Sequence, residues 1–231
     1  DIVVIGGDEV SPIETLNYSL QFGYNSSELP PSISTFLDQY SKTLKKYSYL
    51  KVHVNGHSDS RGSKQENLLL STERANIISD YLLNLGVDSL QLVVNGYGEE
   101  QLVNTCYDGT VCSENEHSVN RRVDFIVKNI ACEIGFESNG FNIKPSDVLK
   151  IKDIVKYITN KDSVVVLIDG YADLGSGTKE INEQISKLRA AKVFHYFDNN
   201  NYNVSYRGYG AINEKYGNDN DRRVQITITY D

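Results

Sequence analysis

Residues 57–78 read HSDSRGSKQENLLLSTERANII, and this stretch decides the fold. It follows a segment in which Leu50, Val52 and Val54 alternate with other residues, a pattern typical of a strand with one buried face. Its second half repeats apolar residues at helical spacing, so the sequence predicts a strand, a polar loop and then an amphipathic helix. Asp59 therefore lies where the strand ends.

The predicted helix presents one stripe, which carries Asn67, Leu70, Ser71, Arg74, Ala75 and Ile78. Arg74 then faces Asp59 across a loop in which Gly62 tolerates a positive φ and lets backbone N–H groups point at a ligand. A carboxylate accepts from an ammonium group, and a fork-shaped guanidinium beside it donates to a carboxylate, so the pair suits a zwitterion. The alternative is a surface salt bridge worth under about 1 kcal/mol.

Four motifs follow one another along the first half of the chain. They are GHSDSRG (residues 56–62), NLLLSTERANII (67–78), GYGEEQLV (96–103) and NRRVDF (120–125). Together they resemble the OmpA-like family, the C-terminal domains of outer membrane protein A, peptidoglycan-associated lipoproteins and flagellar stator subunits. The resemblance implies a domain that binds the diaminopimelate of the peptidoglycan stem peptide, without catalysis and with no cofactor or metal.

The resemblance also implies roles for particular residues. Asp59 takes the diaminopimelate ammonium group and Arg74 its carboxylate. The pocket is lined by Arg61, Asn67, Leu70 and Arg121. Arg121 and Arg122 begin a strand and point to opposite faces, and the resemblance, not the periodicity, assigns Arg121 to the pocket.

The chain then repeats itself with a period of about 114 residues. Phe22 precedes Asp59 by the same number of residues as Phe136 precedes Asp173. Further matches join 182–193 to 67–78, RGYG (207–210) to NGYG (95–98), and DRRV (221–224) to NRRV (120–123). The sequence therefore predicts two copies of one domain. The second copy retains four predicted ligand-binding residues, which are Asp173, Asn182, Arg189 and Arg222.

The second copy departs from the first around this site. Tyr171 replaces His57, Ala172 replaces Ser58, and Gly175 stands opposite Arg61. One residue is also inserted between Asp173 and Asn182. Two interpretations stay open: the second copy binds the same ligand, or Asp173 and Arg189 form an ion pair with a purely structural role.

The predicted fold class is α+β, with two tandem two-layer α/β sandwiches of order βαβαββ and helices on one face of each mixed sheet. In the first copy, strands are expected near 16–22, 50–55, 90–95 and 121–128, and helices from Pro31 and over about 67–85. The predicted domain bounds are 14–130 and 131–231. Residues 1–13 are expected to be a linker or a fragment of an upstream region.

Composition limits the classes of function. The 231 residues suffice for two modest cores, and a net charge of −8 argues against nucleic-acid binding, which needs a basic face. No apolar run approaches the roughly 18 residues of a transmembrane helix. The chain begins at Asp1 and contains no Met, as we expect of a processed or excised piece of an exported protein.

The three cysteines are informative about the compartment. Cys106 and Cys112 flank the loop YDGTV, whose Asp-Gly pair favours a turn, so a local disulfide is expected. A disulfide implies an oxidising compartment, whereas two free thiols are the alternative. Cys132 is left over and is expected to be buried.

Other chemistries are less favoured by the residues. His53 and His57 lie about 13 Å apart on one strand face, which is too far for one metal ion. Ser71 has no base near it in sequence, so packing or capping is favoured over a nucleophile. A hydrolase needs a second carboxylate or a metal near Asp59. A protein-interaction scaffold with vestigial pockets remains the alternative, because the second copy is rich in tyrosine: Tyr196, Tyr202, Tyr206, Tyr209 and Tyr216.

The sequence therefore predicts a non-enzymatic, periplasmic module with no transmembrane segment of its own. Its expected role is to anchor an outer-membrane or envelope protein of a Gram-negative bacterium to peptidoglycan. Its expected partners are the diaminopimelate-containing stem peptide and other envelope proteins, and not nucleic acid.

Overall fold

The computed structural model describes residue 13 and residues 16–128, 130–137, 140–159, 161–173, 177–198, 202–211 and 222–230. Contacts between residues divide the chain into two compact units, Thr15–Lys128 and Asn129–Asp231, and Ile13 is grouped with the second. Residues 1–12, on which the predicted linker falls, lie outside the described part, and Ile13 is fully buried. None of the helices in the described part combines the length and hydrophobicity that spanning a bilayer requires.

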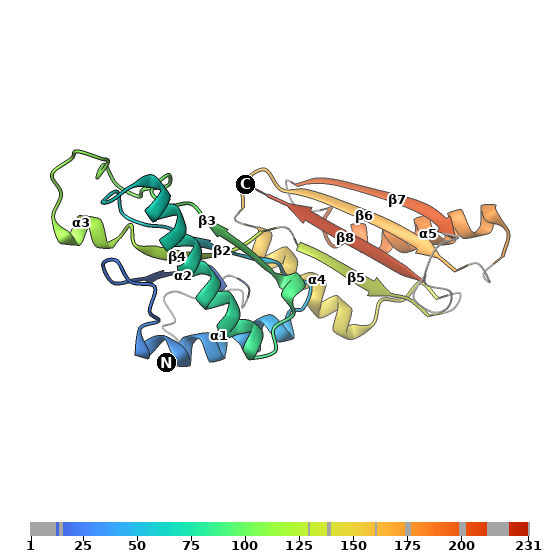
Figure 1. Cartoon of the computed structure of the whole chain (residues 1–231). Helices are drawn as coiled ribbons and strands as arrows, with labels where there is room; N and C mark the ends of the chain where they lie inside the picture. Colours follow the sequence, from blue (N-terminus) through green and yellow to red (C-terminus); the bar gives the residue numbers. More distant parts are fainter. Residues whose placement is uncertain are drawn as a thin grey trace, which may run out of the picture. The chain divides into compact units, whose positions relative to one another are not determined.

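The first unit is built on one four-stranded mixed sheet (Figure 1). Its elements are β1 (Tyr18–Gln21), η2 (Pro31–Ile33), α1 (Ser34–Lys46), β2 (Val52–Gly56), α2 (Lys64–Asn84), η3 (Ser89–Gln91), β3 (Leu92–Gly96), α3 (Glu114–Ser118) and β4 (Arg122–Val127). The strand order is β1-β4-β2-β3. The central strands β2 and β4 are antiparallel, whereas β2 and β3 run parallel, which requires the crossover that α2 supplies.

Both long helices of the first unit cover the same face of the sheet. Val54 and Phe125 are paired across β2 and β4 and are both buried on that face. The rings of Phe36 and Tyr40 from α1 pack against Phe125, with centroids 6.0 and 4.9 Å away. Gly56 on β2 lies directly beneath α2, where a Cβ would collide with the Ser71 carbonyl oxygen. The crossover thus brings the end of β2 and the start of α2 close together.

The helix α2 begins at Lys64, three residues earlier than the sequence predicted. Ser63 and Glu66 form a capping box, in which each side chain accepts a hydrogen bond from the other residue's backbone N–H. Gly86 lies just beyond the other end with φ of 82°, the left-handed conformation that commonly closes a helix. The capping box makes the polar first turn helical although it carries no apolar periodicity.

The short helix α3 is an element that the sequence analysis did not predict. It lies between β3 and β4, and a second capping box, formed by Ser113 and Glu116, fixes its start. His117 is its buried residue. A five-residue helix with one buried side chain has no hydrophobic stripe, so periodicity could not reveal it.

The second unit has the same topology. Its elements are β5 (Ile130–Gly135), α4 (Pro145–Ile158), β6 (Val165–Ala172), α5 (Lys179–Phe194), β7 (Asn203–Ala211) and β8 (Arg223–Thr229). The sheet order β5-β8-β6-β7 corresponds strand by strand to that of the first unit. The predicted fold class is therefore confirmed. Ile130 begins β5, although the sequence analysis placed it in the first copy, and the predicted domain bounds stay predictions.

Candidate functional site

One cavity of about 250 Å³ lies in the first unit at the loop between β2 and α2. It is lined by Tyr24, Asn25, Ser58, Asp59, Arg61, Gly62, Glu66, Asn67, Leu70, Arg74 and Arg121. All six residues that the sequence analysis assigned to the first pocket belong to this set. Whether they bind a ligand is still a prediction.

Asp59 is the buried carboxylate of the site, with only 3% of its surface exposed. Its Oδ1 accepts from the backbone N–H and Nε of Arg61, at 3.1 and 3.3 Å. Its Oδ2 accepts from Arg61 Nη2 at 2.7 Å and from Arg121 Nη1 at 3.1 Å. Burial works against the charged form, but the hydrogen bonds from Arg61 and Arg121 outweigh it and lower the pKa of Asp59. Asp59 is therefore a carboxylate at neutral pH.

A second carboxylate completes a ring of alternating charges with these residues. Glu114 Oε2 accepts from Arg61 Nη1 at 2.9 Å, and its Oε1 pairs with Arg121 Nη2 at 2.8 Å. Each of the two guanidinium groups thus bridges Asp59 and Glu114. The carboxylates differ in exposure, since the Glu114 side chain is 58% exposed and that of Asp59 is 4% exposed.

Arg74 lines the same cavity but is held mainly by backbone. Its guanidinium is fully buried and donates to the carbonyl oxygens of Ser26, His57 and Gly23, at 2.8, 2.9 and 3.0 Å. Burial and the charge of Arg121 lower the pKa of Arg74 to about 10, which still leaves it charged at neutral pH. Backbone carbonyls of the described residues accept from three of its five N–H groups.

Other lining residues shape the cavity. Asn67 donates from Nδ2 to Glu99 Oε2 at 2.6 Å, which fixes its amide. The Ser58 hydroxyl is buried and has no hydrogen-bond partner among the described residues. Arg61 lies over the Tyr24 ring, 4.2 Å from its centroid. Sequence reasoning gave no role to Tyr24 or Glu114, and for Glu114 the available signal was the Ser-x-x-Glu capping pattern at residues 113–116.

His57 and Ser71 have structural roles. His57 Nε2 lies 3.3 Å from Asp124 Oδ2, and its ring stacks on Tyr97. Ser71 Oγ donates to the Leu68 carbonyl and accepts from the backbone N–H of Gly98. The Ser71 contacts tie α2 to the β3 end, and they agree with the prediction that Ser71 serves packing or capping.

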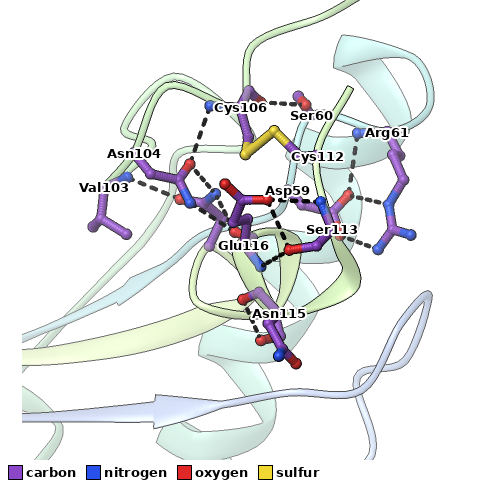
Figure 2. Close-up of a disulfide and its surroundings, with 12 residues drawn as sticks. Asp59, Ser60, Arg61, Val103, Asn104, Cys106, Cys112, Ser113, Asn115 and Glu116 are labelled. Carbon is purple, nitrogen blue, oxygen red and sulfur yellow. Dashed lines mark hydrogen bonds and ion pairs between the residues drawn. A yellow bond between two sulfur atoms is a disulfide. The ribbon is translucent and has the colours of Figure 1, made fainter. Parts of the chain in front are cut away.

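The predicted disulfide between Cys106 and Cys112 is present and lies beside the cavity (Figure 2). Ser60, in the loop after β2, donates from Oγ to the Cys106 carbonyl at 2.6 Å. Cys112 is followed directly by Ser113, the N-cap of α3. The third cysteine, Cys132, is buried, as predicted.

The second unit has a counterpart of Arg74 with the same kind of backbone acceptors. Arg189 donates to the carbonyl oxygens of Glu137, Gly140 and Tyr171, each at 3.2 Å, which are the counterparts of the Arg74 acceptors. Asp173 pairs with Arg222 at 3.4 Å. The Asp173–Arg189 ion pair, an alternative left open by the sequence, is therefore not present among the described residues. Gly175, opposite Arg61, lies outside them.

Fold and site together define the class: tandem α+β domains, each with a carboxylate after its second strand and a buried arginine on the following helix. Comparison with known proteins gives the family. The chain belongs to the OmpA family, whose model matches residues 21–116 and 135–226. The family resemblance stated from the motifs is confirmed.

Several known proteins are similar to this chain. The peptidoglycan-associated lipoprotein of Pseudomonas aeruginosa is 38% identical over 103 residues, which cover 45% of this chain and 58% of that protein. That of Legionella pneumophila is 33% identical, covering 46% and 57%. The chain thus spans less than three fifths of the length of these relatives. The crystal structure of the peptidoglycan-associated lipoprotein from Burkholderia pseudomallei is 26% identical and covers 51% of this chain and 93% of that chain, with a TM-score of 0.45.

Proposed function

We propose that the first unit binds peptidoglycan without catalysis, by taking the diaminopimelate of the stem peptide into the cavity around Asp59. One observation carries this proposal: a buried carboxylate and three guanidinium groups, those of Arg61, Arg74 and Arg121, line one small cavity. Both signs of charge are therefore available to a single ligand. A zwitterionic amino-acid end uses both, whereas a simple anion or cation uses one.

The size of the cavity supports a ligand end of this kind. Pockets for drug-sized ligands typically run from about 300 to 1,000 Å³. A cavity of about 250 Å³ lies below that range and fits one amino-acid end of a longer chain. The ligand ammonium group would donate hydrogen bonds to the Asp59 carboxylate, and the ligand carboxylate would accept from the arginines.

Binding requires Arg61 to move. A carboxylate offers about four lone-pair sites, and Asp59 already accepts four hydrogen bonds. Three of these come from Arg61, whose side chain is 32% exposed and can turn outward. An incoming ammonium group therefore takes over acceptor sites that the Arg61 side chain gives up. The exchange makes the net affinity modest.

The chemistry of the cavity supports binding and not hydrolysis. A general acid needs a carboxyl group that is protonated near neutral pH, and the pKa of Asp59 is lowered instead. The other lining carboxylate, Glu66, is engaged in the capping box with Ser63. Ser71, on the same helix, is bonded to backbone groups.

The proposed setting is the periplasmic side of the cell envelope. The curated relatives reported above are named peptidoglycan-associated lipoproteins. The disulfide between Cys106 and Cys112 is of the kind that forms and persists in oxidising compartments. We therefore assign the chain the role of tethering an envelope protein to the wall.

Sedimentation with purified sacculi tests this function. Wild type should pellet with sacculi, and Asp59→Asn, which keeps the shape but removes the charge, should stay in the supernatant. Asp108→Asn is the matched control, because Asp108 is an exposed carboxylate of the neighbouring disulfide loop. Equal pelleting of wild type and Asp59→Asn would contradict the proposal, and release of soluble wall fragments would point to a hydrolase.

A second function, docking of another envelope protein, is favoured by one observation. Tyr206 and Tyr209 on β7 are 36% and 47% exposed, and exposed tyrosines suit protein interfaces. Tyr216, part of the same predicted set, lies outside the described residues. Under this alternative, wild type would not pellet with sacculi at all.

A further inference from the structure

Glu114 contacts two of the cavity arginines, Arg61 and Arg121, in the way that a ligand carboxylate would. Its two oxygens are divided between two guanidinium groups, Oε2 on Arg61 at 2.9 Å and Oε1 on Arg121 at 2.8 Å. Both arginines also contact Asp59, so Glu114 closes the outer side of the charge ring. The side chain of Glu114 is 58% exposed, which means that water or a ligand can replace it.

The loop that carries Glu114 is fastened close to the cavity. Cys112 lies two residues before Glu114 and is bonded to Cys106, whose carbonyl accepts from Ser60. Asn104 donates to the Glu116 carbonyl at 2.7 Å, from the far side of the disulfide loop (Figure 2). A carboxylate on such a short tether has a high effective concentration at the arginines.

We propose that Glu114 is an internal competitor that sets the affinity of the site: a carboxylate that occupies Arg61 and Arg121 until a ligand carboxylate displaces it. The inference rests on the proposed function, because it requires a ligand with a carboxylate in this cavity. The exchange replaces one carboxylate by another and leaves the charge at the arginines unchanged. A ligand without a carboxylate leaves Glu114 in place, so its affinity is expected not to depend on Glu114.

The exchange also agrees with the movement of Arg61 that binding needs. Arg61 is shared between Asp59 and Glu114 and stacks on Tyr24. When the ligand ammonium group binds Asp59, the Arg61 side chain loses its contact with Asp59. Its guanidinium group can then bind the ligand carboxylate. Arg121, whose side chain is 7% exposed, stays in place and donates to both ligand and Asp59.

Calorimetric titration with a stem tetrapeptide that contains meso-diaminopimelate tests the inference. Because Glu114 is exposed, Glu114→Gln should tighten binding by only roughly three- to fivefold. Asp108→Asn, the same change of charge within the disulfide loop, should leave the affinity at the wild-type value. A peptide amidated at the free diaminopimelate carboxylate should gain nothing from Glu114→Gln. Thermal melts should show both variants folded like wild type.

The outcomes separate the inference from the function on which it rests. If wild type binds the peptide and Glu114→Gln binds it equally or more weakly, the competing role of Glu114 is wrong while the proposed function stands. An equal gain for the amidated peptide would also overturn the inference. If neither wild type nor Glu114→Gln binds the peptide, the proposed function itself fails, and the inference with it.

Discussion

Asp59 and Glu114 show how surroundings give two carboxylates different tasks. Asp59 is enclosed and accepts from two arginines, so it is a fixed charge that defines the cavity. Glu114 contacts the same two arginines from the solvent side, so it can be exchanged. Arg74 differs again, because its three backbone acceptors make it a structural residue as well as a lining one.

The lowered pKa of Asp59 predicts an acid-dependent contribution to stability. A carboxyl group whose pKa is lower in the folded state than in the unfolded state stabilises the folded state. This stabilisation is complete above the unfolded-state pKa of about 3.9 and is lost as pH falls through the folded-state pKa. Urea unfolding of wild type and Asp59→Asn between pH 7 and pH 2 measures the contribution of the Asp59 charge to the free energy of unfolding. The free energies of unfolding should differ by a constant amount near neutrality and converge in acid. A difference that persists unchanged at the lowest pH contradicts the ion pairing.

Burial of Cys132 predicts an inert thiol. Burial raises the pKa of Cys132 to about 12, so the reactive thiolate is essentially absent at neutral pH. Titration with a thiol reagent should detect no reactive thiol in the native protein and one per chain after denaturation without reductant. Rapid native labelling, or three thiols in the denatured protein, would show that Cys132 is accessible or that Cys106 and Cys112 are not bonded.

At the scale of elements, the contact between β2 and α2 positions the site. Gly56 allows the helix to approach, since a Cβ there would meet the Ser71 carbonyl. Gly56→Ala should therefore lower the free energy of unfolding by about 1–3 kcal/mol, through forced displacement of α2. Gly135→Ala is the control, because an added Cβ at Gly135 meets no atom within 4 Å. Chemical denaturation gives the free energy of unfolding of each variant. Equal stability of Gly56→Ala and Gly135→Ala would contradict the close packing of α2.

The elements with strong periodicity could be predicted from sequence, and the contacts around the site only in part. Alternation and helical spacing revealed β2 and α2, because each buries one regular face. The partners of Arg74 are backbone carbonyls of a distant segment, and a backbone carbonyl has no side-chain signature in the sequence. Glu114 lies far along the chain from Arg61, on a helix too short for periodicity. The motif match could therefore name six of the lining residues but not their hydrogen-bond partners.

At the scale of the whole molecule, the second unit keeps the buried arginine of the first unit but differs from it around the predicted binding site. Arg189 has the same three-carbonyl arrangement as Arg74, so this buried arginine supports the fold in both units. Asp173, by contrast, has one arginine contact of 3.4 Å where Asp59 has several shorter ones. Alanine occupies two positions of the second unit, Ala172 and Ala211, where the first unit has Ser58 and Glu99. The two copies thus share architecture more closely than binding chemistry.

These differences predict one strong binding site per chain. Titration of the full chain with the diaminopimelate stem peptide should give a stoichiometry near one, and Asp173→Asn should leave both affinity and stoichiometry unchanged. In the described part of the second unit, the site holds the Asp173–Arg222 pair and no ring of paired charges, so its contribution to affinity is expected to be small. A stoichiometry of two, with one site abolished by Asp173→Asn, would show that both copies bind.

In the proposed function, the cavity recognises the ammonium and the carboxylate of one ligand end together. The most direct measurement compares two stem peptides on wild type, one containing meso-diaminopimelate and one containing lysine, which keeps the ammonium group but lacks that carboxylate. Loss of the charge-assisted hydrogen bonds to the arginines should weaken binding of the lysine peptide by at least about tenfold. Equal affinity for the two peptides would contradict the account.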